Sequence, residues 1–343
     1  MRWNKGLLLA FALAASVVAY SQSPVLVHRQ KYAMGTVFEI ASYGASSGAL
    51  SSALDEALQE AVRLDQIMSD YRADSELSRL NRGAFSVAQA VSPDLYRVIE
   101  IALEYSKLSG GRFDITVGPL AAYWKSVMRG ERARSAADES KLRGCVGYGH
   151  VILRPPDRVE FRCPSTRIDL GAIGKGFAVD RIVEVLRRRG VSNALVNAGG
   201  STLYGMGHPP GEGAWRVVVK DMGDGKTQVL LSEDSLSTSK QSAPSMLGDR
   251  KSGHLVDPLT GEPVATSMTV AVLARTATDS DALSTALLLV GTQRATQLIT
   301  DSSALGALWI SSTGQLEVVS KTPVKWLADA RAEETPLEQK AQR

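Results

Sequence analysis

The densest group of residues that could do chemistry is a glycine-rich turn at residues 169–176, with the sequence DLGAIGKG. It precedes a segment with helical spacing that ends at Gly190. Backbone amides in such a turn and the N-terminus of the following helix attract anions, and Lys175 adds a point charge for a phosphate. The glycine order is not that of a Rossmann fingerprint, and no Ser or Thr follows the lysine as in a Walker A motif. A plain connector with a solvated lysine would explain the same residues.

A second candidate is a pair of oxygen-bearing side chains, Asp281 and Thr285. They are four residues apart in a predicted helix and therefore lie on one of its faces. A carboxylate and a hydroxyl on one face suit a hard divalent cation such as Mg²⁺. Capping of the helix N-terminus by acidic residues is the alternative, and it explains Asp279 better than Asp281.

Two further segments are weak signals when taken alone. Asn197, Gly199 and Gly200 follow a predicted strand, where glycines allow the backbone to approach a ligand closely or simply form a tight turn. His254 begins the run HLVDPLTG and is one of only four histidines. A single histidine is more often structural than catalytic.

The elements that must position these residues mix helices and strands without strict alternation, which favours an α+β or mixed fold over a doubly wound sheet. Helical spacing covers 47–68, and Ser92 with Pro93 begins a second helix that stops at Gly110 and Gly111. Further helices are expected at 176–189 and 279–290, and a polar surface helix or insertion at 129–142. Strands are expected at the end of 25–42, as a hairpin at 151–162, and at 194–197, 215–220, 228–232, 268–273, 307–310 and 316–319.

Composition excludes several classes of protein. The 343 residues are 44% hydrophobic and 22% charged, as in ordinary globular chains, which excludes a disordered chain, a coiled coil and a collagen-like repeat. The sequence contains one long apolar run, which excludes a protein with several membrane spans. After residue 21 the chain carries 37 basic and 36 acidic residues, so it has no electrostatic footprint for nucleic acid.

Residues 1–21 have the pattern of a secretory signal peptide. Arg2 and Lys5 precede an apolar stretch at 6–20, and Ala19 and Ser21 are small residues at the positions that flank a cleavage site, so cleavage is expected near Ser21. This predicts export to the periplasm, with an uncleaved anchor as the alternative. Pairing outward from the turn of the 151–162 hairpin places Cys163 opposite Gly149 rather than Cys145, so we do not expect a disulfide.

Taken together and in order, these motifs resemble the ApbE family of FAD:protein FMN transferases. The resemblance runs from residue 31 to residue 291. It is carried by the segments 34–36, 69–81, 110–120, 169–180, 197–200, 254–261 and 281–285. The sequence departs from the family pattern at Ser280, where alanine is usual, at Lys240 and over 241–253. The last two departures concern the rim of the site.

The resemblance implies an α+β, two-lobed fold of the tunnelling-fold type, with a mixed and largely antiparallel sheet and FAD in a cleft between the lobes. It implies one domain over 22–325, followed by a polar tail at 326–343. The implied FAD-binding residues are Met34, Tyr71, Arg112, Phe113, Asp114, Asp169, Lys175, Asn197, Gly199, Gly200 and His254. The implied metal ligands are the Ala172 carbonyl, Asp281 and Thr285, and the implied catalytic residues are Lys175, His254 and Asp281.

The function implied by the resemblance is Mg²⁺-dependent transfer of FMN from FAD to a threonine hydroxyl of a recipient protein, with release of AMP. His254 is the candidate base for the hydroxyl proton. The expected partners are FAD and a flavin-accepting domain of a membrane redox complex. Two alternatives stay open: an FAD pyrophosphatase that gives FMN and AMP, and an exported flavin-binding protein without turnover.

Overall fold

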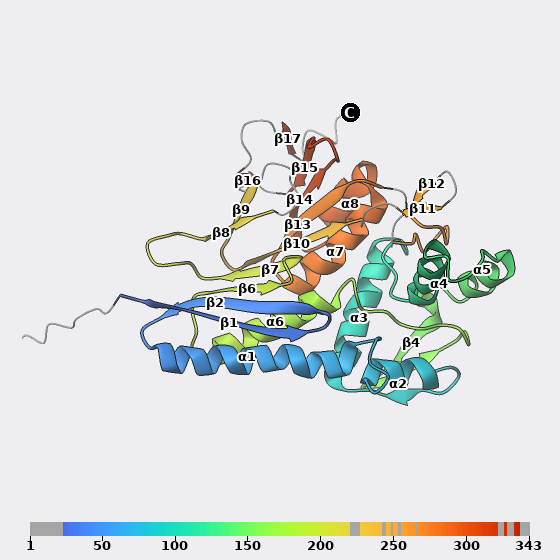
Figure 1. Ribbon diagram of the computed structural model, residues 1–343, viewed down its shortest axis with the longest axis horizontal. Helices are drawn as coiled ribbons and strands as arrows, with labels where there is room; N and C mark the ends of the chain where they lie inside the picture. The colour runs from blue at the N-terminus through green and yellow to red at the C-terminus, as the bar shows by residue number, and fades with distance from the viewer. Residues whose placement is uncertain are drawn as a thin grey trace, which may run out of the picture.

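A large sheet forms the centre of the computed structural model, with the strand order β1-β2-β6-β7-β10-β13-β14-β15-β17 (Figure 1). The strands are β1 (Val25–Ala33), β2 (Thr36–Gly44), β6 (Ala194–Ala198), β7 (Thr202–Met206), β10 (Asp234–Lys240), β13 (Thr269–Ala274), β14 (Ala304–Ile310), β15 (Leu316–Ser320) and β17 (Glu333–Pro336). Every neighbouring pair is antiparallel except β15 with β17. The structure describes residues 23–219, 227–241, 245–247, 250–252, 255–264, 266–321, 326–327 and 333–336. The predicted α+β fold with a largely antiparallel sheet is confirmed.

Layers of helices and strands cover the two faces of this sheet. On one face pack α1 (Ser47–Met68), α6 (Gly174–Arg188), α7 (Ala277–Val290) and α8 (Thr292–Asp301). On the other face lies a small sheet of β8 (Trp215–Val218), β9 (Gln228–Leu231) and β16 (Trp326–Leu327). Strand β13 is buried along its whole length: Val270 and Val272 pack toward the helices, and Leu273 packs toward the small sheet. A strand between two apolar layers buries both of its faces, so its sequence does not alternate.

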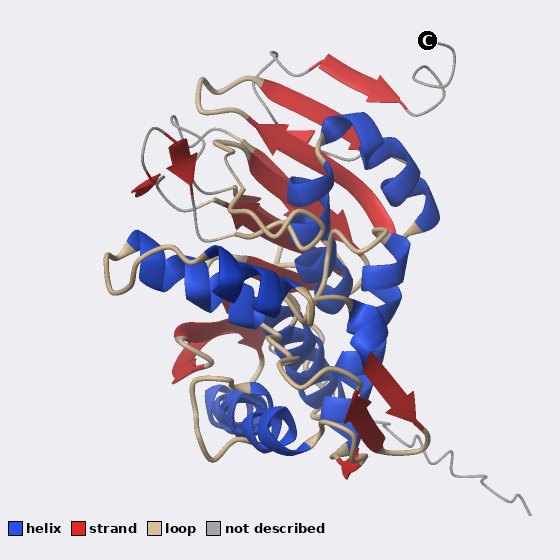
Figure 2. Cartoon of the chain, turned by 90° about the vertical axis from the view of Figure 1, so that its right-hand side faces the viewer, coloured by secondary structure: helices blue, strands red, loops and turns tan. Residues whose placement is uncertain are grey.

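The remaining elements gather on the right-hand side of Figure 1 and are largely helical. They are α2 (Glu76–Gly83), α3 (Pro93–Leu108), α4 (Gly118–Met128), α5 (Ala136–Arg143), the 3-10 turn Tyr148–His150, and the small sheet of β3 (Gln89–Ala90), β5 (Arg158–Phe161) and β4 (Val151–Arg154). A short hairpin joins β11 (Ser245–Leu247) to β12 (Arg250–Ser252). Figure 2 views the molecule from this side, with the large sheet behind the helices. Helix α3 reaches both α1 and α7 and so connects this region to the layered part.

The helices with clear periodicity form where the sequence predicts them. Helix α1 has the predicted bounds, and its buried residues recur at the expected spacing: Leu50, Ala53, Leu54, Ala57, Leu58, Ala61, Leu64 and Met68. Ser92 caps α3, because its hydroxyl accepts a hydrogen bond from the Leu95 amide at 3.4 Å. Helix α5 buries no residue, as expected of a surface insertion. Strands β7 and β10 and helices α2, α4 and α8 were not predicted.

The segment 25–42 is a hairpin rather than one strand at its end. Met34 and Gly35 form the two-residue turn between β1 and β2, with φ of +51° and +74°. Positive φ at both central positions is the geometry that matches the twist of antiparallel strands. The motif that contains Met34 therefore lies at a hairpin tip.

Cys145 and Cys163 form a disulfide, with their Cα atoms 5.4 Å apart, so the expectation of free thiols was wrong. The predicted register is present, since Val151 pairs with Phe161 and the Arg162 amide donates to the His150 carbonyl. Before β4, however, the chain forms the 3-10 turn Tyr148–His150 instead of continuing as a strand. This turn brings Cys145 back to Cys163. Extending the ladder outward from the hairpin turn could not reveal that reversal.

Among the described residues, none of the helices is both long enough and apolar enough to cross a membrane. The predicted signal peptide at 1–21 lies outside the described residues. Within the predicted tail, β16 pairs with β9 and β17 pairs with β15.

The disulfide gives a prediction about stability. Closing a loop across a sequence separation of 18 residues restricts the unfolded chain, and loops of this size contribute about 3 kcal/mol. The double variant Cys145→Ala/Cys163→Ala should therefore lose about 2–4 kcal/mol of unfolding free energy in urea titrations. The wild-type protein in reducing agent should show the same loss, whereas reducing agent should not affect the double variant. Equal midpoints for oxidised wild type and double variant would contradict the bridge.

Candidate active site

Four of the sequence motifs converge on one cavity of about 360 Å³. It lies among the loop before α4, the turn before α6, the end of β10, one face of α7 and the segment 255–258. The lining residues are Arg112, Phe113, Asp114, Ile115, Val117, Ala121, Asp169, Gly171, Ala172, Lys175, Ser201, Thr238, Ser239, Lys240, Leu255, Val256, Pro258, Asp281, Thr285 and Leu289. The structure thus brings together the glycine–lysine turn and the Asp281–Thr285 pair, which are about a hundred residues apart in the chain.

Asp281 is the most deeply buried acid in the cavity wall, with 5% of its surface exposed. One carboxylate oxygen, Oδ2, accepts a hydrogen bond from the Gly176 amide at 2.9 Å. The other, Oδ1, accepts from the Thr202 hydroxyl at 3.3 Å and lies 4.0 Å from the Lys175 ammonium. A buried carboxylate needs such donors and a nearby cation to remain charged.

Gly176 is required at its position because α6 and α7 touch there. A Cβ on this residue would lie 2.2 Å from the Ala277 carbonyl oxygen and 2.7 Å from Cβ of Asp281. The sequence suggested a glycine that exposes its amide to a phosphate. The structure instead gives that amide to Asp281.

Lys175 supplies the positive charge of the site. Its ammonium group donates to the Gly171 carbonyl at 3.1 Å and lines the cavity. Most amides of the turn are engaged within the protein: Gly171 donates to Asp169, and Gly174 donates to the Leu170 carbonyl. The groups that this turn presents to an anion are therefore mainly the Lys175 ammonium and the N-terminus of α6. Most backbone amides of the turn are already hydrogen-bonded within the protein.

The proposed metal ligands fit a hard cation. The Ala172 main chain, Asp281 and Thr285 border the same cavity, and all their donor atoms are oxygens. Within the described ranges, no cluster of three or more His, Cys, Asp or Glu could hold a metal ion. A site with a single carboxylate agrees with Mg²⁺, which keeps several waters and shares its coordination with substrate phosphates.

The loop before α4 is held by Asp114, which also lines the cavity. Its carboxylate accepts hydrogen bonds from the Thr116 amide at 2.8 Å, the Thr116 hydroxyl at 2.6 Å and the Tyr148 amide at 2.6 Å. Burial raises the pKa of Asp114 above its usual range. Asp114 therefore shapes the loop as well as the cavity wall.

Arg112 and Phe113 occupy the same wall in different ways. Arg112 forms an ion pair with Asp257, which fixes the segment after His254 against this loop. Phe113 is 2% exposed and packs edge-on against Tyr105, with ring centroids 6.4 Å apart. His254 itself lies outside the described residues, but its neighbour Leu255 lines the cavity.

The other FAD-binding residues that the sequence predicts, and that the structure describes, do not line this cavity. The Met34 side chain ends beside Gly174, and Tyr71 is 88% exposed. Asn197 holds its own turn by accepting from the Gly200 amide at 2.7 Å. Gly199 is needed for a close contact with Thr36, since a Cβ there would lie 2.0 Å from the Thr36 hydroxyl oxygen. The close contact with Thr36 therefore accounts for Gly199, and Gly200 has a φ of +71°, which favours glycine.

Several residues of the site carried no signal in the sequence. Thr202, Ser237 and Ser239 lie on strands that were not predicted, and their hydroxyls reach Asp281 or α7. Small hydroxyl residues are common in strands, so only their cross-strand neighbours reveal their role.

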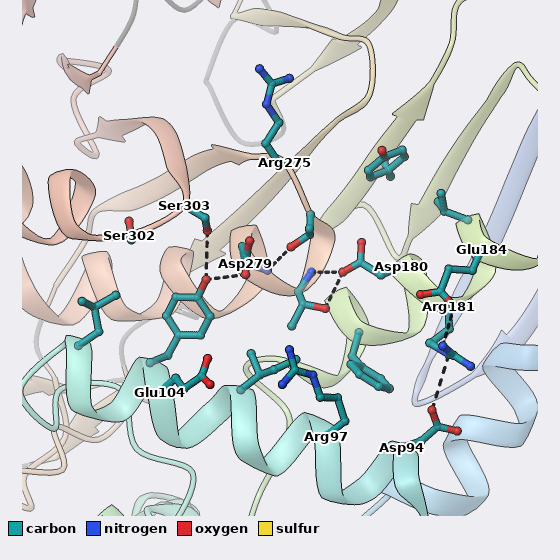
Figure 3. A pocket seen from close by; sticks show the side chains of 18 of the residues that line it. Asp94, Arg97, Glu104, Asp180, Arg181, Glu184, Arg275, Asp279, Ser302 and Ser303 are labelled. Atoms are coloured by element: carbon teal, nitrogen blue, oxygen red, sulfur yellow. Dashed lines mark hydrogen bonds and ion pairs between the residues drawn. The ribbon is translucent and has the colours of Figure 1, made fainter. Parts of the chain in front are cut away.

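A larger cavity of about 800 Å³ lies on the other side of α6 and α7, and Figure 3 shows its wall. Its polar groups are largely paired with one another. Asp180 accepts from the Ala277 and Thr278 amides at 2.7 and 2.8 Å, and Asp279 accepts from the Tyr105 hydroxyl at 2.5 Å. We place the functional site in the smaller cavity, where the predicted residues gather.

Asp70 gives a prediction about titration. Burial, and then the negative charge of Asp169, raise the pKa of Asp70 from 3.8 to about 6. Folding therefore disfavours its ionised form, so the stabilising contribution is present below pH 3.8 and is lost as pH rises through 6. An NMR titration of the Asp70 carboxyl carbon should show a midpoint of about 6, and Asp169→Asn should lower it.

The control for this titration is Asp74→Asn. Asp74 is exposed and pairs with Arg72 at 3.5 Å on the same loop. Its substitution should leave the midpoint of Asp70 in place. A wild-type midpoint near 3.8 would refute the assigned environment.

This chain is similar to proteins of one named family. A model described as the ApbE family matches residues 34–309. The FAD:protein FMN transferase of Treponema pallidum (strain Nichols) is 29% identical over 266 residues, which cover 72% of this chain and 73% of that protein. The protein of the same name from Escherichia coli (strain K12) is 28% identical, covering 68% of this chain and 70% of its own length.

Solved structures show the same fold. The flavin transferase ApbE from Vibrio cholerae superposes with a TM-score of 0.71 at 26% identity and covers 90% of this chain and 98% of its own. The ApbE protein of Thermotoga maritima superposes with a TM-score of 0.75 at 24% identity and covers 85% and 96%, which supports the fold alone. Because the family model extends from the Met34 turn into β14, this chain belongs to the ApbE family.

Proposed function

We propose that this protein transfers FMN from FAD to a threonine hydroxyl of a recipient protein and releases AMP. The observation that carries the proposal is the Lys175 ammonium 4.0 Å from the buried Asp281 carboxylate, in a cavity that Thr285 and Ala172 also line. A cation site beside a fixed positive charge is what a pyrophosphate requires. The relatives named above carry the name FAD:protein FMN transferase.

The reaction requires positioning and charge neutralisation more than covalent help from the protein. The threonine oxygen forms a bond to the phosphorus of the FMN half, and the P–O bond to the AMP half breaks. The bridging oxygen leaves with AMP and keeps the electron pair. Lys175 lies where it can neutralise the charge that grows on the phosphate oxygens, as a preorganised donor.

A base must take the proton of the attacking hydroxyl, and His254 is our candidate. A free imidazole has a pKa of about 6.5, which suits a general base at neutral pH. The flanking chain supports the assignment, because Leu255 lines the cavity and Asp257 is fixed by Arg112. The Asp114 and Asp169 side chains lie in the same wall and would orient the rest of FAD.

The metal in this proposal is Mg²⁺, held by Asp281, Thr285 and the Ala172 carbonyl. When bound, it would supply positive charge to the pyrophosphate oxygens. Asp281 keeps both of its oxygens at fixed positions through Gly176 and Thr202.

We further propose that the protein is exported and acts on a flavin-accepting domain in the periplasm. The Cys145–Cys163 bridge supports this, because disulfides persist mainly in oxidising compartments. The pattern of residues 1–21 is the second support.

A gel experiment tests the function. Purified protein is mixed with FAD, Mg²⁺ and a candidate flavin-accepting domain, then denatured and examined for flavin fluorescence on the recipient band. Fluorescence that requires Mg²⁺ and the acceptor threonine is the expected result. A dark band with FMN and AMP in solution would establish the pyrophosphatase instead, and intact FAD with every recipient tried would leave a flavin carrier.

Asp281→Asn should abolish metal-dependent transfer while leaving a folded protein. The amide keeps the shape of the side chain but removes the charge, and loss of such a group typically lowers the rate by about 100-fold or more. The measurement is the initial rate of transfer at saturating FAD across a range of Mg²⁺ concentrations. Full activity in this variant would remove Asp281 from the mechanism.

Asp279→Asn is the matched control for that variant. Asp279 lies on the same helix, but it faces the larger cavity and bonds to Tyr105 (Figure 3). It should transfer FMN at the wild-type rate even if its thermal stability falls. An equal loss in both variants would indicate that α7 is simply sensitive to substitution.

His254→Ala should slow transfer more than it weakens FAD binding, since a base acts on the reacting hydroxyl. Calorimetry with FAD and the transfer rate measured on the same preparation separate the two effects. If affinity for FAD is lost instead, His254 binds the substrate and another group takes the proton.

A further inference from the structure

Strand β10 presents three serines to helix α7, and these serines contact hydroxyl groups of the helix. Ser235, Ser237 and Ser239 alternate along the strand, so they lie on one of its faces. Opposite them, Ser280 and Ser284 are one helical turn apart on α7. We refer to these five residues as the serine zipper. Ser235, Ser237, Ser280 and Ser284 have no exposed surface.

One branch of the zipper ends at the Asp281 carboxylate. The Thr202 hydroxyl donates to Oδ1 of Asp281 at 3.3 Å, and the Ser237 hydroxyl donates to Thr202 at 3.2 Å. Ser237 and Ser280 lie 2.7 Å apart. Ser280 has one hydrogen, and its hydroxyl also donates to the Ala277 carbonyl at 3.1 Å, so the contact between Ser237 and Ser280 assigns no single donor. Within this branch, the Thr202 hydroxyl directs its hydrogen toward Asp281.

The second branch begins at Thr285. The Ser284 hydroxyl donates to the main-chain carbonyl of Asp281 at 2.8 Å. Since the single hydrogen of Ser284 is used there, Ser239 is the donor in the contact between Ser239 and Ser284 at 2.7 Å. Ser239 then has no second hydrogen, so Thr285 is the donor in the contact between Ser239 and Thr285 at 3.1 Å. The hydroxyl hydrogen of Thr285 is therefore used in a hydrogen bond within the protein, so the Thr285 oxygen can act toward the cavity only as an acceptor.

We propose that Thr202 and three members of the serine zipper, Ser237, Ser239 and Ser284, are positioning residues that make Asp281 and Thr285 ligands for a hard cation. Both branches leave acceptor oxygens facing the cavity, which suits a cation and repels an anion. The inference rests on the proposed metal site and adds residues to which the resemblance gave no role. Groups that orient metal ligands in this way typically change metal affinity by about 10–100-fold when they are removed.

The test is the binding of Mn²⁺ to the full-length protein without FAD, followed by electron paramagnetic resonance. Thr202→Val keeps the shape and removes the hydroxyl, and it should weaken Mn²⁺ binding by about tenfold. Thr202→Ser restores the hydroxyl and should bind within about twofold of wild type. Ser239→Ala frees the hydrogen of Thr285 and should also weaken binding.

Ser235→Ala is the matched control. Ser235 is as buried as the others, but its hydrogen goes to the Leu203 carbonyl at 2.7 Å, away from both ligands. It should leave Mn²⁺ affinity unchanged, although its melting temperature falls. Ser237→Ala removes the donor to Thr202 together with the contact to Ser280, and it gives a milder second test if Thr202→Val does not fold.

The outcomes separate this inference from the proposed function. Wild-type affinity in Thr202→Val and Ser239→Ala, together with loss of Mn²⁺ binding in Asp281→Asn, would overturn the positioning role and keep the metal site. If Ser235→Ala weakened Mn²⁺ binding as much as Thr202→Val and Ser239→Ala, the serine zipper would contribute to packing and would not position the metal ligands. No Mn²⁺ binding by the wild-type protein would overturn the metal site and this inference together.

Discussion

The contact between helices α6 and α7 at Gly176 is the constraint on which the site depends. The two helices approach so closely that a side chain at this position would collide with the Ala277 carbonyl and with Asp281. Because no side chain intervenes, the Gly176 amide reaches Oδ2 of the buried Asp281 carboxylate, whose Oδ1 accepts from Thr202. Lys175, which precedes Gly176 in the chain, lies beside the same carboxylate. The glycine–lysine turn and the acidic helix are therefore one structure.

The α6–α7 pair separates two cavities of different chemical character. On one side the charged groups bind one another and cap the start of α7, where Asp180 accepts from two amides. On the other side Lys175, Lys240, Asp281 and Thr285 line a smaller space. Mutual pairing stabilises the fold, whereas groups directed into a cavity can act on a ligand. The size of a cavity alone would have led to the opposite choice.

The site also depends on how the segment 255–264 is fixed to the helical region. Arg112 pairs with Asp257, the Trp124 indole donates to the Gly261 carbonyl at 2.8 Å, and Arg143 donates to the Leu259 carbonyl at 3.0 Å. These contacts join the loop before α4, helix α4 and helix α5 to the chain that follows His254. A transferase must admit a recipient protein as well as a nucleotide. A wall fixed at three points from different elements leaves the cavity open while keeping its shape.

Local patterns along the chain were enough to predict the helices with strong periodicity, the caps that begin them and the order of the motifs. Helix α1 and the Ser92 cap are set by neighbours within four residues, and Asp281 and Thr285 share a face for the same reason. The disulfide, the use of the Gly176 amide and the hydroxyl branches from Thr202 and Ser239 could be found only in the folded protein. Each of these joins residues from different strands, loops or helices, and their partners depend on how the elements pack rather than on spacing along the chain.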